Sequence, residues 1–308
     1  MIEISLVIPM HNEEASLPQL FERLKKCLEP VTTNYEIICV DDGSRDNTHA
    51  LLKEYHRQDS RIKIIHLTRN FGKEAALTAA LDFASGRAVI PIDADLQDPP
   101  ELIPDMVAKW REGYKVVLAT RRSRPGDSWL KRVSADWFYK AMNSVSTVKL
   151  PPNTGDFRLM DACVVEAVRR LPERTRFMKG IFAWAGFLTT AIYFDRDARV
   201  AGATTWNYWK LWKFALDGIF SFTSVPLRVW TYVGALISLL SFLWALFIII
   251  RTLLFGVNVP GYASLMVAIL FMGGMQLLSV GIIGEYIGRI YRETKQRPLY
   301  LVQEKSGL

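Results

Sequence analysis

Two long apolar stretches near the C-terminal end constrain this chain more than any other feature of its sequence. Residues 229–250 carry no charged side chain, and from residue 263 onward none occurs before Glu285. As a helix rising about 1.5 Å per residue, each stretch is long enough to cross a hydrocarbon core of roughly 30 Å. The pattern therefore predicts two transmembrane helices, with two buried core helices of a soluble protein as the alternative.

Basic residues on either side of these stretches predict their orientation. The connecting segment, residues 256–262, contains no Lys or Arg, whereas basic residues flank the pair at Lys210, Lys213, Arg228, Arg289, Arg292, Lys295 and Arg297. The positive-inside tendency places both flanks in the cytoplasm. The first residues lack the pattern of a secretory signal peptide. We therefore expect a multi-pass membrane protein whose soluble portion and two termini are cytoplasmic.

Composition divides the chain into four regions. We expect a soluble domain over residues 1–200, juxtamembrane helices over 201–228, the two transmembrane helices over 229–288 and a cytoplasmic tail over 289–308. In the juxtamembrane region, apolar residues recur at nearly helical spacing at Trp206, Trp209, Trp212, Leu216 and Phe220. This spacing predicts an amphipathic helix lying in the membrane interface, and an ordinary core stripe is the alternative.

The charge balance narrows the class of partner. A net charge of +7 and a pI near 9.3 suit nucleic acid, an anionic membrane or phosphorylated substrates. The sequence has no zinc-finger spacing, RNA-binding signature or helix-turn-helix, so nucleic acid is disfavoured and the lipid bilayer and phosphorylated ligands are favoured. The three cysteines are scattered, as expected for reduced cytosolic thiols. The four histidines show no metal-ligand pairing and are interpreted as ordinary surface or core residues.

Strand and helix patterns alternate through the soluble portion. Apolar runs typical of strands occur at residues 4–9, 36–40, 62–67, 89–93 and 115–120, and helical periods occur at 15–28, 48–58, 73–84 and 103–110. Such alternation predicts an α/β domain with a largely parallel sheet and helices on both faces.

Polar residues follow each predicted strand, at residues 11–14, 41–44, 68–73, 93–95 and 121–122. Ligands of parallel α/β sheets bind at the carboxyl ends of the strands, and the paired carboxylates Asp93 and Asp95 suit a hard divalent cation that also grips a diphosphate. Taken singly, these residues are also credible helix caps, turn residues or solvated charges. Glycine-rich dinucleotide and P-loop patterns are absent, which disfavours a Rossmann dehydrogenase or a P-loop NTPase.

Several ordered motifs carry a family resemblance. They are VIPMHNEE at residues 7–14, VDDGSRDNT at 40–48, RNFGK at 69–73, DADLQDPP at 93–100 and GIIGEYIGR at 281–289. Over nearly its whole length the chain resembles the family 2 glycosyltransferases with a GT-A (Rossmann-like) fold. Within that family it resembles the polyprenyl-phosphate hexosyltransferases, in particular those that charge undecaprenyl phosphate with glucose for O-antigen modification in bacteria.

The resemblance implies roles for individual residues. Pro9, Glu13 and Asp41 would line the nucleoside pocket, with Asp41 accepting a hydrogen bond from uracil, and Asp42, Lys73, Asp93 and Ala94 would complete the nucleotide site. Asp93, Asp95 and Gln97 would hold Mg²⁺ or Mn²⁺. Arg121, Arg158 and Arg199 would contact acceptor or donor phosphates. Asp95, Asp156 and Arg121 would be catalytic, Asp156 as a base or an orienting group.

The implied reaction is inverting transfer of one glucose from UDP-glucose to undecaprenyl phosphate at the cytoplasmic face of the inner membrane. The Gln-x-x-Arg-Trp signature of processive synthases is absent, which favours single-sugar transfer. The family wording Gly-Glu-Ser-Lys-Tyr is replaced by residues 202–208, GATTWNY, which leaves the acceptor loop around Thr204 and Thr205 unassigned. There are two alternatives. The enzyme uses another sugar nucleotide such as GDP-mannose, or the protein binds a nucleotide sugar without catalysing transfer. The resemblance also implies a homo-oligomer, a tetramer in similar proteins.

Overall fold

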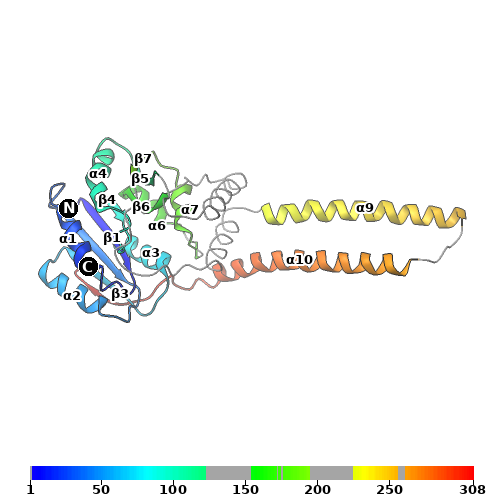
Figure 1. Cartoon of the computed structure of the whole chain (residues 1–308), viewed down its shortest axis with the longest axis horizontal. Helices are drawn as coiled ribbons and strands as arrows, with labels where there is room; N and C mark the ends of the chain where they lie inside the picture. The colour runs from blue at the N-terminus through cyan, green and yellow to red at the C-terminus, as the bar shows by residue number, and fades with distance from the viewer. Residues whose placement is uncertain (1, 123–153, 172, 175, 195–224, 256–260) are drawn as a thin grey trace. The chain divides into compact units, whose positions relative to one another are not determined.

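The computed structural model describes residues 2–122, 154–171, 173–174, 176–194, 225–255 and 261–308 (Figure 1). Two compact units divide the chain, one formed by Met1–Gly218 with Arg297–Leu308 and the other by Ile219–Gln296. Arg199 and the interfacial helix predicted from the tryptophan stripe lie outside the described residues. The first unit contains the sheet, and the second contains two long helices.

The elements follow the predicted alternation closely. The strands are β1 (Ile4–Met10), β2 (Tyr35–Asp41), β3 (Ile62–Leu67), β4 (Ala88–Pro91), β5 (Val116–Arg121), β6 (Thr154–Asp161), β7 (Thr189–Phe194) and β8 (Val302–Ser306). The helices of the same unit are α1 (Leu17–Leu28), α2 (Thr48–Gln58), α3 (Lys73–Phe83), the 3₁₀ turn η1 (Pro100–Leu102), α4 (Ile103–Arg111), α6 (Ala162–Arg169) and α7 (Met178–Trp184).

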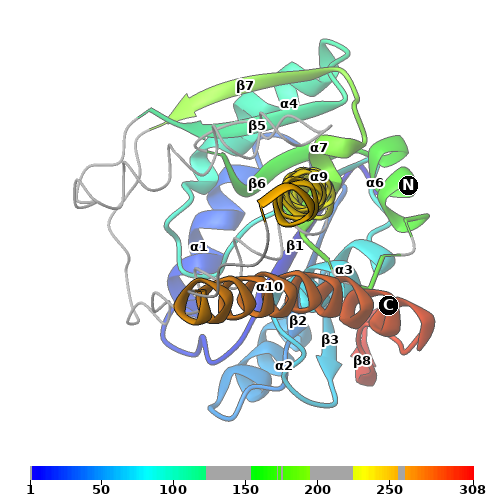
Figure 2. The ribbon, with the colours of Figure 1, turned by 90° about the vertical axis from the view of Figure 1, so that its right-hand side faces the viewer.

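One eight-stranded sheet has the order β7-β5-β6-β4-β1-β2-β3-β8 (Figure 2). The pairs β1–β2, β1–β4, β2–β3 and β5–β7 are parallel, whereas β6 is antiparallel to β4 and β5, and β8 is antiparallel to β3. The predicted α/β fold with a mostly parallel sheet is confirmed. Strands β6, β7 and β8 were not predicted from the sequence.

The central strands β1, β2 and β4 are buried on both faces, as parallel strands covered by crossover helices are, whereas the edge strands β7 and β8 are partly or fully exposed at most positions. On one face Ile4, Leu6 and Ile8 of β1 join a core that includes residues of α1, α2 and α4. On the other face α3 packs on β1 and β2 and α6 packs on β4. The apolar periodicity of α1 and α4 therefore explains the face that each buries, whereas α3 is buried continuously over residues 75–81.

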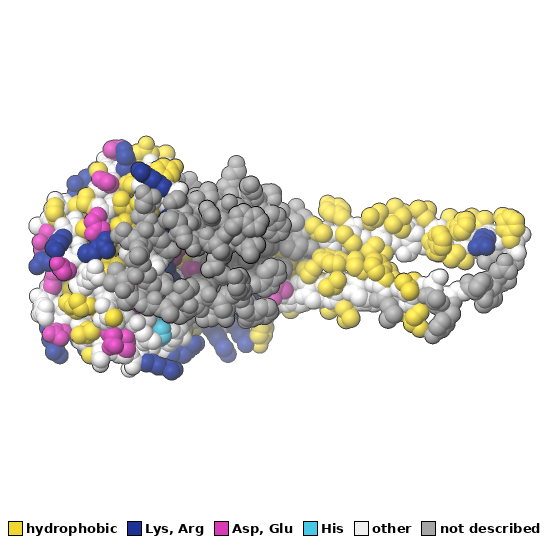
Figure 3. Space-filling model, viewed as in Figure 1, with side chains coloured by type: hydrophobic (Ala, Val, Ile, Leu, Met, Phe, Trp, Pro, Cys, Tyr) yellow, Lys and Arg dark blue, Asp and Glu magenta, His cyan; other side chains and the backbone are white. Residues whose placement is uncertain are grey.

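The second unit contains α9 (Val225–Phe255) and α10 (Tyr262–Thr294). Segments Tyr232–Phe255 and Ser264–Thr294 are long and apolar enough to cross a membrane, with mean hydropathies of 2.6 and 2.1. Large apolar side chains such as Leu253, Phe255 and Leu277 are exposed along both helices (Figure 3). Exposed apolar surface of this extent is stable in lipid and not in water, so the unit is a candidate membrane anchor, as the sequence predicted.

Candidate active site

The topology brings the predicted polar strand ends to one edge of the sheet. Strands β1, β2, β3 and β4 run parallel, and β5 runs the same way because β6 is antiparallel to both β4 and β5. The same antiparallel direction makes β6 begin at this edge, where Thr154 pairs with Thr120. Asp156 and Arg158 thereby reach the carboxyl ends of the parallel strands from a segment far along the chain.

The segment after β4 alternates between buried and partly exposed residues. Ala94, Leu96 and Asp98 are buried, whereas Asp93, Asp95 and Gln97 are partly exposed. Leu96 has a left-handed backbone with φ of 58°, and the Oδ1 atom of Asp95 accepts a hydrogen bond from the Gln97 amide at 3.2 Å. The three residues predicted to hold a metal therefore share one side of a turn that the buried Leu96 side chain anchors.

Lys73, the first residue of α3, joins two carboxylates from different strands. Its ammonium lies 2.7 Å from Asp93 and 2.9 Å from the Oδ2 atom of Asp156. Burial opposes ionisation of Asp156, but the charges of Lys73, Lys179 and Arg158 outweigh burial and hold the pKa of this carboxyl well below its usual range. Asp156 is therefore ionised at neutral pH, and it fixes the Lys73 ammonium beside the Asp93 turn.

Arg121, at the end of β5, reaches the same centre. Its Nη2 atom donates to the Oδ1 atom of Asp98 at 3.2 Å, and its buried Nε atom has no hydrogen-bond partner among the described residues. Burial and the nearby Asp93 charge raise the pKa of Asp98, and Arg121 opposes that rise. A partly exposed guanidinium with an unused donor is suited to an anionic ligand such as a phosphate oxygen.

Arg158 plays a different structural part. Its side chain is only 3% exposed, its Nη2 atom donates to the Gly155 carbonyl at 2.7 Å, and its guanidinium lies 4.4 Å from the centre of the Phe182 ring. Burial lowers its pKa to about 10, so it stays charged. The register between β5 and β6 is irregular at this point, as is common beside active sites. Arg158 holds the irregular start of β6, which presents Asp156.

Glu74, which the sequence reasoning did not single out, lies next to this centre. Its carboxylate accepts a hydrogen bond from the Met178 amide at the start of α7 at 3.2 Å. Burial, followed by the charge of Asp156, raises its pKa to about 7. No local sequence pattern distinguishes this residue from an ordinary acid in the first turn of a helix, because its partners come from distant segments.

The residues predicted for the nucleoside pocket lie along β1 and β2. Pro9 is partly exposed in β1, and Glu13 lies in the following loop, where its amide donates to the Thr48 hydroxyl at 2.8 Å. The buried Asp42 carboxylate accepts hydrogen bonds from the Phe71 and Gly72 amides at 2.7 and 2.8 Å. Asp42 therefore clamps the loop that leads into Lys73. Ala94 is part of the apolar core.

Glycine is required at position 43 for this clamp. Gly43 has φ of 63°, and a Cβ atom placed on it would lie 2.5 Å from the carbonyl carbon of Arg69. The loop after β2 therefore packs directly against the backbone of the loop after β3. The two loops form one rigid wall beside the carboxyl ends of the strands.

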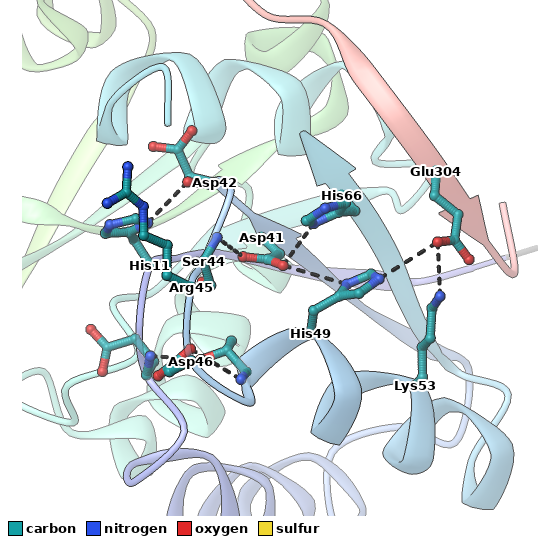
Figure 4. A network of polar contacts seen from close by, with 12 residues as sticks. His11, Asp41, Asp42, Ser44, Arg45, Asp46, His49, Lys53, His66 and Glu304 are labelled. Atoms are coloured by element: carbon teal, nitrogen blue, oxygen red, sulfur yellow. Dashed lines mark hydrogen bonds and ion pairs between the residues drawn. The ribbon is translucent and has the colours of Figure 1, made fainter. Parts of the chain in front are cut away.

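Asp41 lies in a network of its own (Figure 4). Its Oδ2 atom lies 2.8 Å from the Nδ1 atom of His66 and 3.4 Å from that of His49, and its Oδ1 atom accepts from the Ser44 amide at 3.0 Å. The interpretation of these histidines as ordinary residues overlooked the β2–β3 register, which pairs Asp41 with His66.

Most of the predicted site residues thus meet at one edge. Lys73, Asp93 and Asp156 are in direct contact, and Arg121 reaches Asp98 in the turn that also carries Asp95 and Gln97. Two buried acceptor atoms, Oε1 of Gln97 and Oδ1 of Asp156, have no hydrogen-bond partner among the described residues. Buried acceptors without partners are costly unless a ligand satisfies them. The arrangement is suited to binding a polyanion together with a cation.

Two family profiles match parts of this chain. The profile of "Glycosyl transferase family 2" matches residues 5–169, and that of "GtrB C-terminal hairpin" matches residues 225–290. An uncharacterized glycosyltransferase of Synechocystis sp. is 61% identical over 100% of this chain and 96% of its own length. A bactoprenol glucosyl transferase of Shigella phage SfV is 49% identical over 99% of both chains. A prophage bactoprenol glucosyl transferase homolog of Escherichia coli is 46% identical over 98% and 99%.

Solved structures give more distant matches. The crystal structure of glucosyl-3-phosphoglycerate synthase from Mycobacterium tuberculosis in complex with Mn²⁺, UDP and phosphoglyceric acid is 18% identical, with a TM-score of 0.48 over 71% of this chain and 76% of that chain. S. aureus TarS in complex with UDP-GlcNAc is 18% identical, with a TM-score of 0.47 over 70% and 66%. Given the family profile over more than half of the chain and the full-length relatives, the chain belongs to glycosyl transferase family 2.

Proposed function

We propose that this protein transfers one glucose from UDP-glucose to undecaprenyl phosphate at the membrane surface. The observation that carries the proposal is similarity at 46–50% identity, over almost the full length of both chains, to proteins named bactoprenol glucosyl transferases. The matched region includes both the sheet domain and the C-terminal helical hairpin. The acceptor named by these relatives is a membrane lipid, which fits an anchor made of two apolar helices.

The donor is proposed to lie along the ends of β1, β2 and β4. Its nucleoside would lie near Pro9, Glu13 and Asp41, and its diphosphate would lie toward Lys73 and the turn that carries Asp93 and Asp95. Lys73 already contacts Asp93 and Asp156, so its ammonium is held in place before any substrate binds. A cation held in advance stabilises a phosphate leaving group without reorganisation during the reaction.

The metal-ligand atoms that the turn offers suit a hard divalent cation. Asp93, Asp95 and Gln97 offer oxygen ligands on one side of the turn, and the buried Oε1 atom of Gln97 has no hydrogen-bond partner among the described residues. Oxygen ligands are those that Mg²⁺ and Mn²⁺ prefer. When bound there, the ion neutralises charge on the diphosphate leaving group.

The acceptor phosphate needs little activation. A phosphate monoester has a second pKa near 6 and is mostly dianionic at neutral pH, so it can attack the anomeric carbon of glucose without losing a proton to the protein. An acceptor oxygen forms the new bond to that carbon as the bond to UDP breaks, which inverts the configuration. We propose that Arg121 screens the repulsion between the two anions, and that the ionised Asp156 orients Lys73 and does not act as a strong base.

The C-terminal strand supports an even number of membrane crossings. Strand β8 follows α10 in the chain, yet it pairs with β3 in the same sheet that precedes α9. If both helices span the membrane, the chain must therefore return to the side on which it started. Together with the basic flanking residues, this supports two spans, with the sheet domain and both termini in the cytoplasm of a bacterial cell. The homo-oligomeric state remains a proposal from the resemblance.

The proposal is tested by a transfer assay on membranes that contain the full-length protein. Undecaprenyl phosphate and Mn²⁺ or Mg²⁺ are supplied with labelled UDP-glucose, UDP-galactose or GDP-mannose in parallel, and label in the organic phase is measured. We expect label from UDP-glucose, in a single-sugar product that mild acid releases. Label from another donor alone would mean that the reaction is the proposed one but that the transferred sugar is not glucose. UDP binding without transfer from any donor would favour a non-catalytic nucleotide-sugar binding protein.

A further inference from the structure

A cluster of nitrogen and oxygen ligands lies at the ends of β2 and β3. Asp41 ends β2, His66 pairs with it in the register of β3, and His49 is the second residue of α2. Ligand atoms of the three side chains all lie within 4.8 Å of one another. Figure 4 shows both imidazole rings directed at the Asp41 carboxylate, and Glu304 of β8 on the far side of His49.

His49 lies between two carboxylates. Its Nδ1 atom is 3.4 Å from Asp41, and its Nε2 atom is 3.5 Å from Glu304. The buried Nδ1 atom of His49 has no hydrogen-bond partner among the described residues. A neutral imidazole carries one N–H group and can donate to only one of the two carboxylates. When Glu304 accepts this hydrogen bond, the Nδ1 lone pair of His49 faces the Asp41 oxygen, and a bound cation removes this repulsion.

We propose that Asp41, His49 and His66 form a binding site for a transition-metal ion of the Zn²⁺ class. Two imidazole nitrogens and one carboxylate oxygen are a donor set for borderline ions such as Zn²⁺, unlike the oxygen donors of Asp93 and Asp95. Glu304 would act as an outer partner of His49, because a carboxylate beside the non-ligating nitrogen of a histidine fixes the orientation of the ring. The Asp41 side chain is fully buried, while those of His49 and His66 are 23% and 15% exposed, so an ion has access from solvent.

Occupancy of this site has two consequences. The ion joins β2, β3 and α2. Through Glu304 it also stabilises strand β8, which an ion pair of 2.8 Å between Glu304 and Lys53 of α2 already anchors. The ion also engages the Asp41 carboxylate, so binding of Zn²⁺ and of the nucleoside should oppose each other. This second consequence rests on the proposed function, whereas the binding site itself does not.

Co²⁺ is a suitable probe, because its visible absorption is strong in low-coordinate imidazole sites and weak in six-coordinate oxygen sites. Tag-free full-length protein in detergent is titrated with Co²⁺ and then with Zn²⁺, without substrates. We expect strong absorption that saturates at a single ion and disappears when Zn²⁺ displaces Co²⁺. His49→Gln with His66→Gln should abolish it, Glu304→Gln should weaken the affinity roughly 10- to 100-fold, and Asp95→Asn should leave it unchanged.

Either of two results would overturn the site. One is absence of the strong absorption from the wild-type protein at sub-millimolar Co²⁺. The other is equal absorption and affinity in the histidine variants. Should the double variant not fold, Glu304→Gln decides alone, because its side chain is 44% exposed and an unchanged affinity would contradict the proposal. A failure of glucose transfer would leave these binding results untouched, so the two proposals fail separately.

Discussion

Replacement of Asp42 by Asn tests whether this carboxylate holds the loop that leads into Lys73. Asp42 is 3% exposed, and its two oxygens accept hydrogen bonds from the Phe71 and Gly72 amides at 2.7 and 2.8 Å. The Asn side chain keeps one acceptor oxygen and turns an NH₂ group toward the other amide. Two donors then face each other at a buried position.

The expected loss of stability follows from the two hydrogen bonds that Asp42 accepts. A hydrogen bond to a charged group contributes roughly 1.5–3 kcal/mol, and a buried donor left without a partner costs roughly 1–3 kcal/mol. Because these terms overlap, we expect Asp42→Asn to lower the free energy of unfolding by about 2–4 kcal/mol. In a domain of about 150–250 residues, this corresponds to a Tm lower by roughly 5–15 °C. Transfer should also fall, because Lys73 follows the loop directly.

Thermal unfolding of the purified full-length protein in detergent measures this loss. Asp95→Asn is the matched control, since Asp95 is partly exposed and accepts from the Gln97 amide at a longer 3.2 Å. We expect this control to change Tm by less than about 3 °C while transfer collapses. A Tm for Asp42→Asn within a few degrees of wild type, or an equal fall in both variants, would show that the Asp42 carboxylate does not hold this loop.

Three further predictions concern charge at the same edge of the sheet. Lys73→Met leaves the Asp93 and Asp156 carboxylates without their shared ammonium, so initial transfer rates should fall at least tenfold, and a rate within twofold of wild type would contradict the assignment. Glu74 has a pKa raised to about 7 from 4.5, first by burial, so the folded protein retains a proton that the unfolded chain releases. The free energy of unfolding should therefore decrease by up to about 3 kcal/mol as pH rises from about 4.5 to 7. Tm measured against pH should show this decrease in the wild type and a smaller decrease in Glu74→Gln. Parallel Tm curves for the two proteins would contradict the raised pKa of Glu74. Removal of divalent ions with EDTA should stop transfer, and Mn²⁺ or Mg²⁺ should restore it in the wild type but not in Asp95→Asn.

The sequence predicted the parallel core of the sheet because local patterns determine it. Each strand from β1 to β5 is an apolar run followed by polar residues, and α1, α2 and α4 each show an apolar period. The carboxyl ends of parallel strands must share one edge, so grouping Asp41, Asp93 and Arg121 needed no tertiary information. The two apolar helices were equally evident, since length and lack of charge suffice.

The remaining features depend on contacts between distant segments. Strand β8 has the sequence VQEKS, which is polar and resembles a solvated tail until it pairs with β3. The clamp at Asp42 and the raised pKa of Glu74 depend on residues of other elements. The two histidines at Asp41 come together only through the β2–β3 register and the start of α2, which no spacing in the sequence reveals.

We propose the turn at Asp95, with Lys73 and Asp156, as the centre of glucose transfer to a polyprenyl phosphate. The most direct test compares initial rates of label transfer from UDP-glucose to undecaprenyl phosphate in purified wild-type protein and in folded Asp95→Asn. We predict a lipid-linked monosaccharide from the wild type and a rate at least 100-fold lower from the variant, on the scale of losing one electrostatic contact to the transition state. Equal rates in the two proteins, or no lipid-linked product from the wild type, would contradict this assignment.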